Sequence, residues 1–200
     1  FMREWIALYD SKSGERGIFN REAAQAQASK YERRDPNIQY GTNPCSEIIL
    51  RPKQFCNLTE VVVRENDTIK TLKDKIELAT ILGTIQSCFT SFRGLSSHWR
   101  RNTEEERLLG VSLTGIMDNA MLSNKTDQDL PKILDELRLH AVSVNKTWAH
   151  KLDIEPSAAI TCVKPSGTVS QLVNSASGIH PRHNDYYIRT IRADKKDPLT

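Results

Sequence analysis

The sequence lacks a long apolar run, a signal-peptide pattern at its N-terminus and a strong charge of either sign. No stretch of about 18 apolar residues occurs, which excludes a conventional membrane-spanning helix. The net charge of +3 over 200 residues is too small to indicate nucleic-acid binding by itself. We therefore expect neither a membrane nor a nucleic acid as a direct partner, and the missing secretion signal favours a cytoplasmic protein.

Cysteine is scarce, and its spacing excludes the common zinc motifs. Four cysteines occur, with no CxxC pair and no Cys/His cluster at zinc spacing, so no metal site is expected. Without a secretion signal they are expected as thiols and not as a disulfide framework. Cys88 lies in a helical apolar pattern and Cys162 in a strand pattern, which predicts core positions for both. Cys45 and Cys56 lie in polar, turn-rich segments, where a reactive thiol is more plausible.

The most informative stretch is Asn43-Pro44-Cys45-Ser46-Glu47, which carries an amide, a thiol and a carboxylate at alternate positions. If the segment is extended, these three groups line one face of it. They would combine a hydrogen-bonding group, a redox-capable sulfur and a base. The structural alternative stays open, because Asn-Pro is a common turn dipeptide and a single cysteine is usually a small buried apolar residue.

A second feature is the turn Lys164-Pro165-Ser166-Gly167-Thr168-Val169-Ser170, which follows the apolar run 158–163. The run is typical of a buried strand. A turn rich in small and hydroxyl residues can present backbone N–H groups and hydroxyls to a phosphate. The same composition also occurs in ordinary loops, and the Gly-Lys-Ser/Thr ending of a P-loop is missing.

The remaining sequence alternates helical and buried-strand patterns, which predicts an α/β protein with parallel strands. Helices are predicted at 2–9, 21–33, 71–92 and 128–151, with a short one ending at 122, and strands at 48–50, 60–64, 108–113, 158–163 and 186–192. Thr103-Glu104-Glu105-Glu106 has the character of a capping box at a helix start. No linker divides the chain, so a single unit is expected.

Several motifs, in order along nearly the whole chain, resemble those of ribonucleotide reductases. They are Asn43-Pro44-Cys45-Ser46-Glu47-Ile48, Phe55-Cys56-Asn57-Leu58, Leu109-Gly110-Val111-Ser112-Leu113-Thr114-Gly115, Pro165 to Leu172, and Ser177-Gly178-Ile179-His180-Pro181-Arg182. The residues of these motifs are most similar to those of the adenosylcobalamin-dependent (class II) enzymes, particularly the monomeric ribonucleoside-triphosphate reductases. The spacing of eleven residues between Cys45 and Cys56 agrees with class II.

The resemblance implies a ten-stranded α/β barrel with a central finger loop, and residues 1–200 would form part of that catalytic barrel domain. Cys45 matches the finger-loop cysteine that becomes a thiyl radical and abstracts the ribose 3′ hydrogen. Glu47 matches the carboxylate that takes the 3′-hydroxyl proton, and Asn43 matches the amide that binds the ribose hydroxyls. Cys56 matches one member of the reducing dithiol. The phosphate turn corresponds to Ser166, Gly167, Thr168, Val169 and Ser170.

The resemblance also implies groups that lie outside the chain. The second cysteine of the dithiol is expected before Phe1, and most contacts to adenosylcobalamin after Thr200. A thioredoxin-like dithiol is the expected reductant, and the 200 residues alone are not expected to turn over. Two alternatives remain: a ribonucleoside-diphosphate reductase of the same superfamily, and a non-catalytic nucleotide-binding module in which Cys45 only packs.

Five polar or aromatic candidates near the C-terminus favour structural roles. His180 and His183 have no evident third ligand for a metal. Arg182 could attract a phosphate, but a surface position is the preferred interpretation. The pair Tyr186-Tyr187 is expected to pack within the predicted strand 186–192.

Overall fold

The centre of the fold is a pair of parallel strands, β3 (Asn57–Val62) and β4 (Leu109–Thr114). A computed structural model describes residues 1–14, 17–30, 33–124 and 129–198. The strands pair in register from Asn57 opposite Leu109 to Val62 opposite Thr114. Between them the chain forms α3 (Ile69–Gln86) and α4 (Ser97–Glu106). A helical crossover between parallel strands confirms the predicted α/β class.

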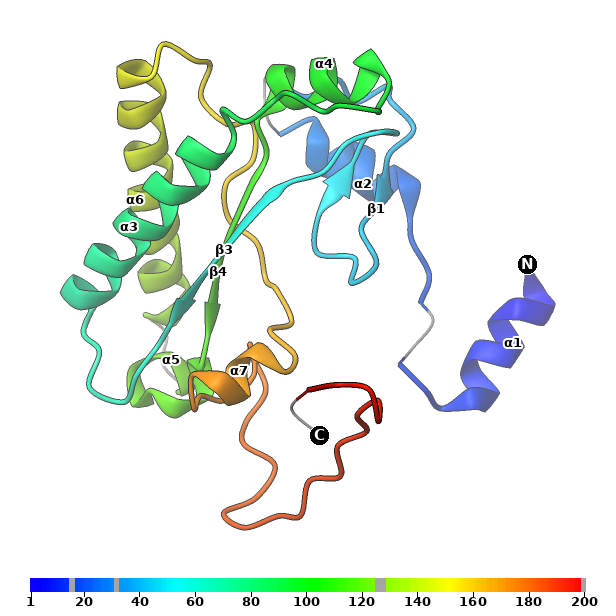
Figure 1. Ribbon diagram of the computed structural model, residues 1–200, viewed down its shortest axis with the longest axis vertical. Coiled ribbons are helices and arrows are strands. Elements are labelled where there is room, and N and C mark those ends of the chain that lie inside the picture. Colours follow the sequence, from blue (N-terminus) through cyan, green and yellow to red (C-terminus); the bar gives the residue numbers. More distant parts are fainter. Residues whose placement is uncertain (15–16, 31–32, 125–128, 199–200) are drawn as a thin grey trace.

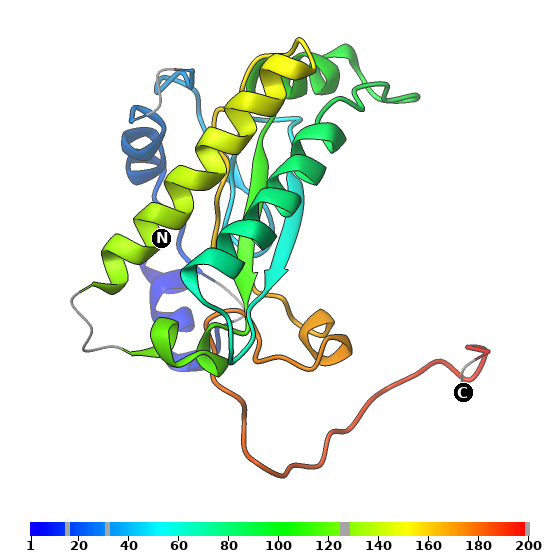
Figure 2. The ribbon, with the colours of Figure 1, turned by 90° about the vertical axis from the view of Figure 1, so that its left-hand side faces the viewer.

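Two long helices, α3 and α6 (Leu130–Lys151), cover one face of the β3–β4 pair (Figures 1 and 2). Alternate strand residues and one stripe of each helix form the core between them. Its buried members are Val61, Val63, Leu72, Ile76, Ala79, Leu109, Val111, Leu122, Leu137, Ala141 and Ile160. Fully burying one of the larger of these side chains contributes about 1.5–3 kcal/mol, so this layer holds the strands in place.

The boundaries of α3 differ from the predicted ones, and a capping box sets its N-terminal end. Helix α3 begins after Thr68, whose side chain forms a reciprocal capping box with Thr71, and ends at Gln86, six residues before the predicted end at Phe92. The predicted start of α6 at Gln128 lies outside the described residues, and the helix runs from Leu130.

The N-terminal helices are shorter elements beside the core. Helix α1 (Met2–Ser11) confirms the predicted helix 2–9 and buries no residue, whereas α2 (Arg21–Ala28) buries two alanines. The prediction of a helix to Arg33 is wrong beyond Ala28, and residues 31–32 of it lie outside the described residues. The predicted capping box at 103–106 is also wrong, because these residues form the C-terminal turn of α4.

The segment 158–163 runs beside β4 on the side opposite β3, but it is not a regular strand. Val111 donates to the carbonyl of Ile160 at 2.8 Å, and Cys162 donates to the carbonyl of Val111 at 3.1 Å. Only Val111 and Thr161 form a bridge. On the N-terminal side, the N–H of Leu109 donates to the carbonyl of Ala159 at 3.0 Å and the N–H of Ala158 donates to the carbonyl of Glu106 at 2.8 Å. The N–H of Ser157 is taken by the side chain of Asn145 at 2.9 Å.

The prediction of a strand at 186–192 is wrong. The segment has no regular structure, and Tyr186 is 91% exposed. A strand needs a neighbour for its backbone N–H and C=O groups, and among the described residues none pairs with this one. Tyr187 donates its hydroxyl to Gln171 at 3.0 Å, so the tyrosines do not pack in a sheet.

Short elements complete the fold around the ends of the strands. They are β1 (Gly41–Thr42), β2 (Ile49–Leu50), η1 (Ile116–Asp118), α5 (Ala120–Ser123) and α7 (Val169–Leu172). The predicted short helix ending at Leu122 is confirmed by η1 and α5, and the extended segment at 48–50 by β2. No helix among the described residues is long and apolar enough to cross a bilayer.

Gly115 ends β4 in a conformation that other residues resist. Its φ is +78°, and a Cβ there would lie 2.7 Å from the carbonyl oxygen of Val63. We expect Gly115→Ala to lower the free energy of unfolding by more than the ~1–3 kcal/mol of backbone strain alone. The matched control is Gly94→Ala, which has a φ of +83° but open space around the new methyl group. Equal urea midpoints for the two variants would contradict the close contact with Val63.

Candidate functional site

The stretch 43–47 forms the tight loop of a small hairpin, not an extended segment. Strands β1 and β2 pair antiparallel, with Thr42 opposite Ile49. The carbonyl of Asn43 accepts from the N–H of Ser46 at 3.0 Å, and Ser46 has a φ of +63°. This turn corrects the expectation that alternate side chains line one face. It leaves the thiol of Cys45 exposed at the tip of the loop.

Asn43 closes this loop with its side chain. Its Oδ1 accepts from the N–H of Ile48 at 3.0 Å and from the hydroxyl of Thr42 at 3.3 Å. An amide that accepts from backbone in this way stabilises a turn. The Nδ2 end of the amide faces Glu47, so the turn places the predicted amide and carboxylate next to each other.

The carboxylate of Glu47 lies inward and is 3% exposed. The ammonium of Lys164 lies 3.0 Å from its Oε1, yet neither carboxylate oxygen makes a well-directed hydrogen bond to the described residues. Burial raises the pKa of the Glu47 carboxyl, but its own N–H, Lys164 and Asn43 outweigh burial and hold the pKa below its ordinary value. The result is a buried, ionised carboxylate with lone pairs left to accept a proton or a hydrogen bond.

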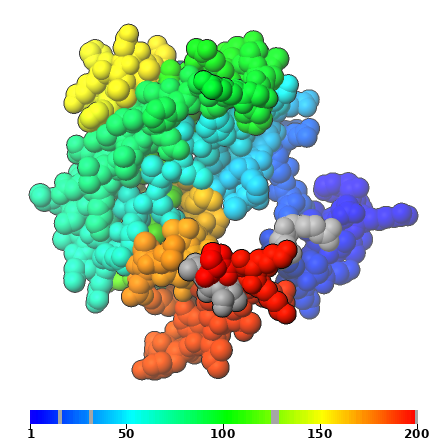
Figure 3. Space-filling model, in the orientation of Figure 1, coloured from blue at the N-terminus to red at the C-terminus, as the bar shows by residue number. Residues whose placement is uncertain are grey.

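Lys164 joins the hairpin loop to the predicted phosphate turn. It is the residue directly before Pro165, and its side chain reaches back to Glu47. Figure 3 shows the hairpin segment in light blue and the 160–172 segment in orange on the same face of the molecule. The structure therefore brings together two motifs that are about 120 residues apart in the sequence. Sequence reasoning assigned no role to Lys164; its only signal was a lone cation between an apolar run and a hydroxyl-rich turn.

The turn after Lys164 is fixed by hydroxyl contacts to the end of β4. The Oγ atoms of Thr114 and Ser166 lie 2.8 Å apart, and the N–H of Gly178 donates to Thr114 at 2.9 Å. Ser170 donates its hydroxyl to the carbonyl of Gly167 at 2.7 Å. Two of the predicted phosphate contacts, Ser166 and Ser170, are thus buried and shape the turn.

The exposed part of the turn is available to a ligand. Gly167, Thr168 and Val169 are exposed, and Gly167 has a φ of +55°. A left-handed residue next to a helical start directs successive N–H groups to one side, an arrangement that suits an anion. The space around Gly167 is open, since a Cβ there would meet nothing within 4 Å.

Two thiols lie next to the carboxylate. Burial, followed by the charge of Glu47, raises the pKa of Cys56 to about 11. Burial, followed by the proximity of Cys56 and Glu47, raises the pKa of Cys162 to about 12. Both sulfurs therefore carry their hydrogens at neutral pH. Cys162 was predicted as a core residue, but it is only half-buried and belongs to this cluster.

Gly110 on β4 leaves the space that Cys162 occupies. A Cβ at Gly110 would lie 3.1 Å from the Cys162 sulfur and 2.4 Å from a methyl carbon of Leu58. Close packing of this kind allows no added methyl group without movement of its neighbours. The glycine in the Leu109–Gly115 motif thus permits the thiol cluster to form against the strand.

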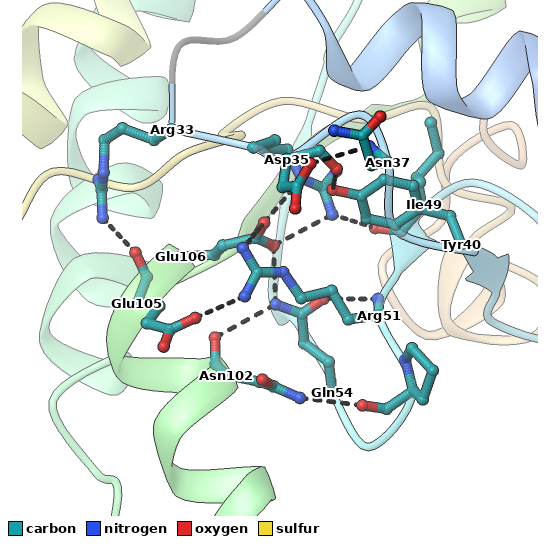
Figure 4. A network of polar contacts seen from close by, with 12 residues as sticks. Arg33, Asp35, Asn37, Tyr40, Ile49, Arg51, Gln54, Asn102, Glu105 and Glu106 are labelled. Atoms are coloured by element: carbon teal, nitrogen blue, oxygen red, sulfur yellow. Dashed lines mark hydrogen bonds and ion pairs between the residues drawn. The ribbon is translucent and has the colours of Figure 1, made fainter.

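Behind the hairpin, a buried ionic network fixes its position (Figure 4). Glu106, at the end of α4, is 0% exposed and lies 3.1 Å from Arg34 and 2.8 Å from Arg51. Gln54 donates to the same carboxylate at 2.8 Å. Arg34 also donates to the carbonyl of Ile49 in β2 at 2.8 Å. No sequence pattern indicates this network, because its members are separated by up to 72 residues.

The C-terminal candidates lie apart from this cluster. Arg182 pairs with Asp118 at 2.9 Å and donates to Asn174, so its guanidinium is engaged within the chain. The ring of His183 contacts that of Tyr187 edge to face, and His180 approaches the carbonyl of Ser177. Among the described residues, no three His, Cys, Asp or Glu side chains are placed to share a metal ion.

Comparison with known proteins gives consistent matches, although no family model matches the chain. An adenosylcobalamin-dependent ribonucleoside-triphosphate reductase of Lacticaseibacillus paracasei is 31% identical over 223 residues, covering 97% of this chain and 29% of the relative. One from Euglena gracilis is 28% identical, covering 91% of this chain and 24% of the relative. A crystal structure of a B-12 dependent (class II) ribonucleotide reductase matches with a TM-score of 0.59 at 26% identity, covering 70% of this chain and 22% of that one. The resemblance to class II ribonucleotide reductases is confirmed.

This reductase-like chain spans under a third of the length of these relatives. The described residues form one parallel and one antiparallel strand pair, so the mixed α/β class agrees with part of a reductase barrel. The complete ten-stranded barrel and its finger loop stay predictions. The hairpin β1–β2 carries Cys45 at its tip.

Proposed function

We propose that this chain is part of the catalytic barrel domain of an adenosylcobalamin-dependent ribonucleoside-triphosphate reductase, acting in the cytoplasm. The reaction converts a ribonucleotide to its 2′-deoxyribonucleotide. One observation supports this most strongly: the contact of 3.0 Å between Lys164 and Glu47 joins the Cys45 loop to the Ser166–Ser170 turn. A nucleotide bound there can place its phosphates on the turn while its ribose lies against the loop.

In this proposal each of three loop residues has a separate chemical role at the ribose. The Cys45 sulfur, as a radical, takes the 3′ hydrogen, and the Glu47 carboxylate takes the proton of the 3′-hydroxyl. The lowered pKa of Glu47 keeps it ready to accept that proton. The Asn43 amide, whose oxygen already closes the loop, directs its Nδ2 end to the same hydroxyls.

Cys56 supplies reducing equivalents in this proposal. Its raised pKa keeps the sulfur protonated, so it can deliver a hydrogen as the 2′-hydroxyl leaves as water. The two electrons come from Cys56 and a second cysteine beyond this chain, which become a disulfide. A thioredoxin-like dithiol restores the pair.

The exposed position of Cys45 is compatible with radical generation that depends on adenosylcobalamin. Its thiol lies at the tip of the hairpin, so a bulky group can approach it while Glu47 stays buried behind. When bound, adenosylcobalamin supplies an organic radical by homolysis of its cobalt–carbon bond. This chain's part is to hold the Cys45 sulfur in place for the radical.

The proposal is tested by turnover of the full-length parent protein. We expect deoxyribonucleotide formation from ribonucleoside triphosphates with adenosylcobalamin and a dithiol, without a second protein subunit. Faster reduction of the diphosphates under the same conditions would assign the chain to a diphosphate reductase instead. A strict requirement for an added metal-containing subunit would contradict class II chemistry.

A further inference from the structure

Lys164 is a charged group of the cluster to which neither the sequence motifs nor the proposed mechanism gives a task. Its side chain is 25% exposed, and its ammonium lies 3.0 Å from Oε1 of Glu47. A lysine that served only solubility would extend into water, because holding the side chain in one place costs rotamer entropy. Here it is directed inward, toward a carboxylate that is 3% exposed.

The ion pair with Lys164 offsets the cost of burying the ionised carboxylate of Glu47. An isolated carboxylate removed from water becomes neutral unless a positive charge or hydrogen-bond donors compensate it. Asn43 also lowers the pKa of Glu47, but its amide is neutral and supplies no positive charge. Lys164 is the only cation among the groups that influence the pKa of Glu47.

The other titratable groups around Lys164 all favour or tolerate a cation there. Glu60 on β3 has a buried carboxylate oxygen without a hydrogen-bond partner, and Lys164 opposes the rise of its pKa on burial. Lys164 also opposes the rise of the pKa of Cys56, directly before β3, and of Cys162, beside β4. The close contact with the Glu47 carboxylate is the main cause of the raised pKa of Lys164, and the exposed Cys45 contributes less. Removing the ammonium would leave Glu47 and Glu60 without the cation that lowers the pKa of both carboxyls.

We propose that Lys164 is a positioning residue that orients the Glu47 carboxylate and keeps it ionised for proton transfer from the substrate hydroxyl. The inference rests on the proposed function and deepens it at the same site. Because Lys164 also begins the phosphate turn, its backbone fixes the distance between the turn and the base. The side chain acts on the base, and the turn that follows acts on the phosphates.

The test uses Lys164→Met and Lys164→Arg in the full-length parent protein. For Lys164→Met we expect kcat to fall about tenfold to a hundredfold, less than the ~10²–10⁴ of a removed base. The acidic limb of the kcat–pH profile should move to higher pH, since burial then dominates at Glu47. KM should change less than about threefold, and Lys164→Arg should restore the profile because it retains the charge.

Two controls separate a positioning role from a general loss of structure. Lys70→Met removes an 86% exposed lysine that pairs with Asp74 at 3.6 Å, and it should leave kcat and its profile unchanged. In a Glu47→Gln background, Lys164→Met should add little, since both changes act on one proton transfer. Nucleotide binding by equilibrium dialysis checks that each variant keeps its fold, and Lys164→Gln replaces the methionine variant if that one does not bind.

The outcomes distinguish this inference from the proposed function. An active wild-type protein in which Lys164→Met keeps its kcat and its pH profile would overturn the positioning role alone. A rise in KM with unchanged kcat would also overturn it, and would assign the ammonium to the substrate phosphates. A wild-type protein without any nucleotide reduction would overturn the proposed function and this inference together.

Discussion

Replacing Cys45 by serine is expected to abolish nucleotide reduction and to leave nucleotide binding within about twofold of the wild type. Serine keeps the size and hydrogen-bonding ability of the side chain, and the thiol is exposed at the hairpin tip, so the fold should not change. A hydroxyl holds its hydrogen too strongly to replace a thiol in radical abstraction. The expected loss is on the order of 10⁴-fold or more, as for removal of a reacting atom in other enzymes.

The measurement is turnover and equilibrium nucleotide binding of the full-length parent protein. Cys88→Ser is the matched control, because Cys88 follows α3 and its thiol donates to the carbonyl of Thr84 at 3.7 Å, away from the hairpin loop. It should retain activity. If Cys45→Ser reduces nucleotides at the wild-type rate, the proposed mechanism is wrong, and a non-catalytic nucleotide-binding module would then explain the site better.

The second large effect is expected for Glu106→Ala, which should destabilise the protein by about 3–5 kcal/mol. The carboxylate is fully buried and pairs with Arg34 and Arg51, so its removal takes the buried carboxylate from Arg34 and leaves Arg51 with Glu105. Arg34 also holds the backbone of Ile49, so the hairpin should loosen as well. We expect lower activity together with lower stability, although Glu106 contacts no part of the proposed substrate site.

Urea unfolding and hydrogen exchange of segment 41–50 check this prediction in the full-length protein. The matched control is Glu105→Ala, one residue earlier, whose side chain is 48% exposed and pairs with Arg51 at 2.5 Å. A partly exposed pair of this kind contributes about 0–1 kcal/mol. Similar losses for the two variants would show that the buried network does not anchor the hairpin.

Local patterns were sufficient for the parallel core and the chemistry-bearing motifs. The apolar spacing of residues 71–92 predicts α3, although the helix ends at Gln86, and the apolar run 108–113 predicts β4. The strand-like pattern at 186–192 did not predict the structure correctly, because a strand depends on a partner and not on its own residues alone. Strand-forming residues specify a strand only when a neighbouring strand accepts their hydrogen bonds, and the described residues provide none.

For the candidate site, the sequence predicted the residues but not the conformation of the loop that carries them. The sequence identified Asn43, Cys45, Glu47 and the hydroxyl-rich turn, because the spacing of these motifs resembles that of a known family. It misjudged the conformation of the loop, which is turned and not extended, since the Asn43–Ser46 hydrogen bond and the left-handed Ser46 form only in the folded hairpin. It also placed Cys162 in the core.

The sequence by itself determined which residues are proposed to carry the chemistry, the α/β class and the family that the chain resembles. Only the tertiary structure decided which of these residues meet. Lys164 reaches Glu47 across more than a hundred positions, and Glu106 reaches Arg34 across 72. Such contacts depend on the packing of the whole chain, because a buried charge is stable only where folding brings its partner to it.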